Sequence, residues 1–126
     1  MGRKYGLEPD AWQAAKQELL DILVATARER AFITYGECTA RLQTLHAHPG
    51  SYVFTALLRE VCGEQERLGH GMLCALVVQK ASGKPGHGYW LGMDCPQADL
   101  EACWRAECDF VWDYWQNTSP TSEETA

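Results

Sequence analysis

The 126-residue sequence predicts a small α+β domain of the winged helix-turn-helix type. Three observations carry this prediction. Apolar residues recur at helical spacing in several segments, a nearly continuous apolar run fills residues 72–78, and a glycine- and lysine-bearing stretch separates that run from Tyr89-Trp90-Leu91. The expected order is helix, strand, helix, helix, strand, wing, strand, helix. Residues 1–117 are expected to form a single domain, and residues 118–126 a disordered polar tail.

The first helix is predicted over residues 9–30, because Pro9 and Asp10 both suit the first turn of a helix. Its apolar stripe has helical spacing and consists of Trp12, Ala15, Leu19, Ile22 and Leu23.

A short extended segment, residues 31–33, leads into a second helix. Thr34 and Glu37 have the spacing of a capping box, in which the Thr34 hydroxyl accepts from the Glu37 amide and the Glu37 carboxylate accepts from the Thr34 amide. The side chains expected to point inward from this helix are Cys38, Leu42 and Leu45.

The third helix is predicted over residues 51–67, with Ser51 as its N-cap after a turn at Pro49-Gly50. Its expected inner face is Phe54, Leu57, Leu58 and Val61, with Leu68 one turn further on. Its expected outer face is Tyr52, Thr55, Ala56, Arg59 and Gly63.

The second half of the chain is predicted to form an antiparallel hairpin and a final helix. Residues 72–78 are expected to be a buried strand, residues 79–88 the wing, and residues 89–91 the returning strand, with Phe32-Ile33 as a possible third strand. An amphipathic helix is predicted over residues 96–116.

Composition excludes several classes of protein. With 46% hydrophobic and 22% charged residues the chain is not a disordered polypeptide. It contains neither an apolar run long enough to span a bilayer nor a secretory signal, so we expect a cytoplasmic protein without membrane contact and with six reduced cysteines. The net charge is +1 over residues 1–93 and −7 over residues 94–126, which confines any surface that binds polyanions to the first part.

Duplex DNA is the partner that this fold class suggests, although the net charge of −6 argues against tight nonspecific binding of nucleic acid. The predicted contacts are Tyr52, Thr55 and Arg59 on the third helix, with Lys80 and Lys84 on the wing. His87 lies on the same wing. Against DNA binding, three acids follow at once on the third helix: Glu60, Glu64 and Glu66.

Two motifs, ITYGE and LCALVVQKASGKPGHGY, resemble the C-terminal domain of the O6-alkylguanine-DNA alkyltransferases and alkyltransferase-like proteins. They also resemble small uncharacterised bacterial proteins with a TYGE and PG-x-G pattern. The resemblance covers residues 31–92 and implies a winged helix that contacts DNA. It places Cys74 near the alkyl-acceptor cysteine, and Ser51 and Tyr52 near an arginine that enters the base stack. Ala75 and Leu76 replace the histidine and arginine of that family, and Leu73 replaces its proline.

The surroundings of Cys74 argue against catalysis. A thiol is nucleophilic as the thiolate, which needs a nearby base or cation, whereas apolar residues flank Cys74 on both sides. We therefore expect Cys74 to be a packed residue, unreactive toward alkylated guanine and slow toward thiol reagents. The other cysteines form no C-x-x-C pair, and His46 and His48 are expected to be solvated turn residues. The sequence predicts no metal and no cofactor.

Two residues of the last helix break its pattern. Glu107 lies in the middle of the apolar arc, which predicts a largely buried carboxylate with a strong donor from a cation or from backbone amides of residues 79–90. A role as catalytic acid is the alternative. Trp112 lies on the acidic side, which predicts either an indole covered by the N-terminal segment, an anchor for a protein partner, or an incidental exposed aromatic side chain.

These observations favour a binding module over an enzyme. The first hypothesis is a non-catalytic, DNA-binding or DNA-associated winged helix. The second is an acidic protein-interaction module that docks through the C-terminal aromatic helix, and the third is a cysteine alkyl-acceptor enzyme at Cys74.

Overall fold

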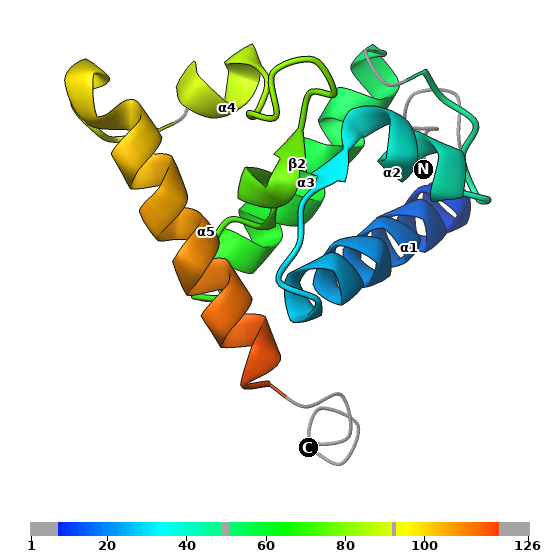
Figure 1. Cartoon of the computed structure of the whole chain (residues 1–126). Helices are drawn as coiled ribbons and strands as arrows, with labels where there is room; N and C mark the ends of the chain where they lie inside the picture. Colours follow the sequence, from blue (N-terminus) through cyan, green and yellow to red (C-terminus); the bar gives the residue numbers. More distant parts are fainter. Residues whose placement is uncertain (1–7, 49–50, 92, 119–126) are drawn as a thin grey trace.

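A computed structural model of the chain describes residues 8–48, 51–91 and 93–118 (Figure 1). Within these residues the fold is α+β and mostly helical, with one two-stranded sheet, which confirms the α+β class. The elements in chain order are α1 (Pro9–Arg28), β1 (Ile33–Thr34), α2 (Tyr35–Arg41), α3 (Tyr52–Arg67), the 3₁₀ helix η1 (Leu73–Leu76), β2 (Val77–Val78), α4 (His87–Leu91), the 3₁₀ helix η2 (Gln97–Asp99) and α5 (Leu100–Gln116).

Local sequence fixes where α2 and α3 begin. The Glu37 amide donates to the Thr34 hydroxyl at 3.0 Å, and the Thr34 amide donates to the Glu37 carboxylate at 2.9 Å. The Ser51 hydroxyl accepts from the Phe54 amide at 3.2 Å. The predicted capping box and the predicted N-cap are therefore both confirmed.

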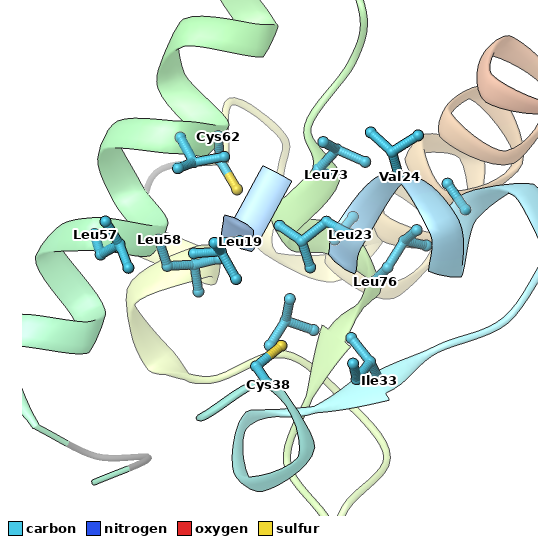
Figure 2. Close-up of a cluster of buried hydrophobic side chains, with 14 of the residues drawn as sticks. Leu19, Leu23, Val24, Ile33, Cys38, Leu57, Leu58, Cys62, Leu73 and Leu76 are labelled. Carbon is cyan, nitrogen blue, oxygen red and sulfur yellow. The ribbon is translucent and has the colours of Figure 1, made fainter. Parts of the chain in front are cut away.

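The core lies where α1, α3 and α5 pack around η1. Figure 2 shows the side chains that meet there, which come from α1 (Leu19, Leu23), α3 (Leu57, Leu58, Cys62), η1 (Leu73, Leu76), β1 (Ile33) and α2 (Cys38). The apolar stripe of α1 and the inner face of α3 thus pack into the core, as their helical spacing predicts. Leu68 is the exception, because it lies just beyond the end of α3 and is 64% exposed.

The predicted antiparallel hairpin is wrong. Residues 73–76 form the 3₁₀ helix, and only Val77 and Val78 are a strand. This strand pairs in parallel with β1, with Ile33 opposite Val77 and Thr34 opposite Val78. β1 thus confirms a strand near residues 32–33.

Side chains of α5 explain why residues 72–76 need no neighbouring strand. The Trp104 indole donates to the Ala75 carbonyl at 2.8 Å, and the Glu107 carboxylate accepts from the Met72 amide at 2.8 Å. These bonds satisfy backbone groups that a strand would have paired with a sheet. A continuous apolar run has no period, so it fits a buried 3₁₀ helix as well as a strand.

Residues 89–91 are the second correction, since they belong to helix α4 rather than to a returning strand. Two hydrogen bonds fix the segment before α4. The Gly86 amide donates to the Tyr35 hydroxyl at 3.0 Å, and the Trp90 indole donates to the Pro85 carbonyl at 3.0 Å. The predicted tail begins at Thr118, whose hydroxyl donates to the Tyr114 carbonyl; the rest of it lies outside the described residues.

Glu18 joins α1 to the segment after α2. Its carboxylate accepts from the amides of Gln43 and Thr44 and from the Thr44 hydroxyl, at 2.7–3.0 Å. These bonds, led by that of the Thr44 amide, outweigh the effect of burial and hold the pKa of Glu18 below its ordinary value of 4.5.

Because the folded pKa is lowered, this stabilisation is present above pH 4.5 and is lost as pH falls through the folded pKa. We expect Glu18→Gln to reduce the free energy of unfolding at pH 7 by ~1 kcal/mol and to weaken its decrease in acid. Urea unfolding between pH 7 and pH 3 measures this, with exposed Glu29→Gln as the control. Parallel pH profiles for wild type and Glu18→Gln would contradict it.

Candidate functional site

A pocket of about 830 Å³ opens between α3, the start of α2, η1 and the segment from Gln79 to Tyr89. Its lining includes buried or half-buried apolar, aromatic and sulfur-bearing side chains, namely Tyr35, Leu58, Cys62, Met72, Cys74 and Tyr89. Its exposed lining residues include Thr55, Arg59, Lys80 and His87, which are polar or basic. An apolar interior with basic groups at the mouth suits a flat, uncharged group carried by an anionic chain.

Four of the predicted site residues meet at this pocket, namely Thr55, Arg59, Cys74 and Lys80, and His87 of the predicted wing lines it as well. Tyr52 lies one helical turn before Thr55 on the same face of α3 and is 72% exposed. Lys84 does not share the lining, because its ammonium group forms an ion pair with Glu101 of α5 at 2.8 Å. Lys84 is therefore the weakest of the predicted DNA contacts.

Two of the three acids that argue against DNA binding face away from the pocket. Glu60 and Glu64 form ion pairs with Lys16 of α1, at 3.2 Å for Glu60. Burial lowers the pKa of Lys16, but hydrogen bonds with Glu64 and Glu60 outweigh it and raise that pKa, so the ammonium group stays charged. The third acid, Glu66, does line the pocket.

Tyr35 connects the capping box to the pocket. Its hydroxyl accepts from the Gly86 amide, and its ring meets the Phe54 ring edge-on with centroids 6.3 Å apart. Burial raises the pKa of Tyr35. A side chain at Gly86 would lie 3.0 Å from the Tyr35 hydroxyl, so glycine lets the loop approach closely. Sequence reasoning used Thr34 and Glu37 and did not foresee this role of Tyr35 between them.

Tyr89 supplies a second phenol to the pocket lining. Its hydroxyl oxygen is buried and has no hydrogen-bond partner within the described residues. Burial raises the pKa of Tyr89, with Cys74 and Glu107 adding to the effect, so the phenol keeps its proton. Tyr89 therefore brings an unused donor to the same region of the fold as Cys74.

Cys74 is half-buried and lines the pocket, whereas the other unbridged cysteines of the described chain, Cys38, Cys62 and Cys108, are buried. Cys74 lies close enough to Cys62 to raise the pKa of the Cys62 thiol, after burial. Ala75 and Leu76, which follow Cys74, are fully buried in the core. The histidine among the described lining residues is His87, the first residue of α4, and its side chain is exposed. No described base contacts the Cys74 thiol.

The expectation of six reduced cysteines is wrong for one pair, because a disulfide joins Cys95 to Cys103. The η2 turn lies between the two residues and brings the chain back on itself. The two cysteines are eight residues apart and form no C-x-x-C motif, so their spacing does not reveal the pairing.

Glu107 is half-buried rather than largely buried, and its donor is the Met72 amide, which is neither a cation nor an amide of residues 79–90. Trp112 is covered by its own chain. Its indole donates to the Ala31 carbonyl at 3.0 Å, its ring meets Phe32 edge-on, and the Arg30 guanidinium lies 5.1 Å from the ring centroid. These contacts cover Trp112 in part, and the residue is half-buried.

We expect Glu107→Ala to lower the free energy of unfolding by roughly 1–3 kcal/mol, because it leaves the Met72 amide without its acceptor. Glu107→Gln keeps an acceptor and should cost less. Chemical denaturation compares them with Glu101→Ala, which removes an exposed carboxylate paired with Lys84. A loss at Glu101 equal to that at Glu107 would contradict this assignment.

Comparison with models of protein families, with curated proteins and with solved structures finds no match for this chain. In the described parts of the chain, His, Cys, Asp and Glu side chains form no group of three or more that could hold a metal ion. None of the described helices combines the length and the apolar character needed to cross a membrane.

Proposed function

We propose that the chain is a non-catalytic, DNA-associated binding module in which α2 and α3 form the helix-turn-helix pair. The segment from Gln79 to Tyr89, which runs from β2 into α4, takes the place of the wing. The observation that carries the proposal is the pocket between α3 and that segment, with Arg59, Lys80 and His87 exposed in its lining. Basic groups on both sides of the opening suit the phosphates that flank a single nucleotide.

The pairing of Glu60 and Glu64 with Lys16 supports this assignment. It removes two carboxylates from the charge that DNA would meet on the outer face of α3. Tyr52 and Thr55 extend that face by one turn toward the helix N-terminus. Side chains at these positions suit contacts to phosphate oxygens or base edges.

The apolar interior suits a base that is turned out of the double helix. Enzymes and binding proteins that extrude a base receive it between aromatic or apolar side chains, at a cost of a few kcal/mol for unstacking. The volume of about 830 Å³ exceeds what one nucleobase needs, and Tyr35 and Tyr89 provide aromatic walls. Because Cys74 has a thiol as its neighbour rather than a base, we propose recognition without transfer of an alkyl group.

Fluorescence anisotropy of a labelled duplex tests the proposal. We expect binding at low salt, with the logarithm of the association constant falling linearly against the logarithm of salt concentration. A duplex with an O6-alkylated guanine should bind more tightly than the unmodified duplex, and mass spectrometry should find Cys74 unalkylated afterwards. Anisotropy that stays constant at low salt, even at high protein concentration, would overturn the proposal.

Docking of a protein on α5 is the second candidate, and one observation favours it. Phe110 of α5 is 49% exposed, and Leu68 is another large exposed apolar side chain. If this surface rather than the pocket binds the partner, Phe110→Ser should abolish partner capture and leave duplex binding unchanged.

A further inference from the structure

Two of the unbridged thiols meet in the wall of the pocket. Cys62 comes from α3 and Cys74 from η1, and both residues line the cavity. The two residues come from successive elements that pack together, and Cys74 lies close enough to Cys62 to raise the pKa of its thiol. Figure 2 shows Cys62 on α3 in the buried cluster that also contains Leu73 of η1.

The two thiols differ in their exposure to molecules that enter the pocket. Cys62 is 1% exposed, and burial followed by the contact with Cys74 raises its pKa, so it remains protonated. Cys74 is half-buried, so a small molecule that enters the pocket reaches Cys74 first. An accessible thiol beside a protected one is the arrangement in which the first is attacked and the second resolves the product.

We propose that Cys62 and Cys74 form a thiol-modification site for small disulfides of the form RSSR that fit the pocket. In the first step the Cys74 thiolate attacks one sulfur of RSSR, the S–S bond breaks, and RS⁻ leaves and takes the proton that Cys74 lost. In the second step the Cys62 sulfur attacks Cys74 Sγ in the mixed disulfide and gives up its proton to the departing thiolate. A second RS⁻ leaves and is protonated, so the products are a Cys62–Cys74 disulfide and two molecules of RSH.

The rest of the described chain explains why this pair is selected. Cys38 is buried, and Cys108 is buried with its thiol directed to the Ala75 carbonyl at 3.7 Å. Cys95 and Cys103 are already joined to each other. The proposal depends on the pocket and its two thiols, and it holds whether or not the occupant of the pocket is DNA.

The test is incubation of the native protein with cystamine, followed by intact mass and peptide mapping without reduction. The wild type should lose the mass of two hydrogen atoms and yield a peptide pair linked through Cys62 and Cys74. Cys62→Ala should stop at a cystamine-derived mixed disulfide on Cys74, and Cys74→Ala should not react at Cys62.

The peptide map of the wild type shows whether the Cys62–Cys74 disulfide forms, even if a variant is unstable. A stable mixed disulfide on wild-type Cys74, without the Cys62 link, would overturn the resolving step. Modification of Cys38 or Cys108 as fast as Cys74 would overturn the selectivity. Because no nucleic acid is present, these outcomes are independent of the DNA experiment.

Discussion

Replacing Arg59 and Lys80 together with alanine is expected to weaken duplex binding on the order of tenfold at ~0.1 M salt. The two side chains come from α3 and from the loop, and both line the pocket opening. If each contacts one phosphate, the slope of log K against log salt should fall by about one unit for each lost contact. Anisotropy titrations at several salt concentrations give both quantities.

Lys84→Ala is the matched control for this experiment. Lys84 lies on the same loop and carries the same charge as Lys80, but its ammonium group is paired with Glu101. It should change the salt slope less than Lys80→Ala. If Lys84→Ala weakens binding as much as Lys80→Ala, the effect comes from net charge, and the proposed surface is wrong.

The largest effect on stability is expected from Gly71→Ala, because two penalties add at this position. Gly71 has a φ of +83°, and a Cβ there would lie 2.8 Å from the Phe110 ring and 2.9 Å from Val111. The left-handed backbone costs an L-residue roughly 1–2 kcal/mol, and forcing α5 away adds roughly 1–3 kcal/mol. We therefore expect the free energy of unfolding to fall by roughly 2–5 kcal/mol.

Gly69→Ala separates the two penalties. Gly69 has nearly the same φ, +84°, but no atom lies within 4 Å of a Cβ placed there. It should lose only the backbone part, roughly 1–2 kcal/mol. Urea unfolding under non-reducing conditions measures both variants. Equal losses at the two glycines would show that a side chain at residue 71 carries no steric penalty against α5, and would contradict this prediction.

The parts of the fold that the sequence predicts are those set by neighbouring residues. Thr34 and Glu37 cap α2 because their spacing alone allows both hydrogen bonds. The apolar stripe of α1 and the inner face of α3 are buried because helical spacing gathers them on one side. None of these features needs information from a distant segment.

The failures share a cause, since each depends on a contact between distant segments. The backbone of residues 72–75 is satisfied by Trp104 and Glu107, about thirty residues further on, and the sequence shows no sign of that pairing. Lys84 loses its predicted role to Glu101, and Glu60 and Glu64 are turned toward Lys16 of α1.

The site follows the same rule. Thr55, Arg59, Cys74 and Lys80 were recognisable one by one from residue type and expected face. The pocket that unites them requires Tyr35 to hold Gly86 and requires α3 to place Cys62 beside Cys74. A single sequence cannot show that three separate segments meet in this way.

Protection of Cys74 by DNA is the most direct measurement of whether a duplex covers this pocket. The rate of modification of Cys74 by N-ethylmaleimide is followed by peptide mass spectrometry, with and without a saturating O6-alkylguanine duplex. Cys74 lines the proposed DNA-facing pocket, so bound duplex should slow its modification several-fold, while the buried Cys38 and Cys108 remain the slowest in both conditions. An unchanged rate at Cys74 in protein shown to be DNA-bound would contradict the account, because the duplex would then lie elsewhere.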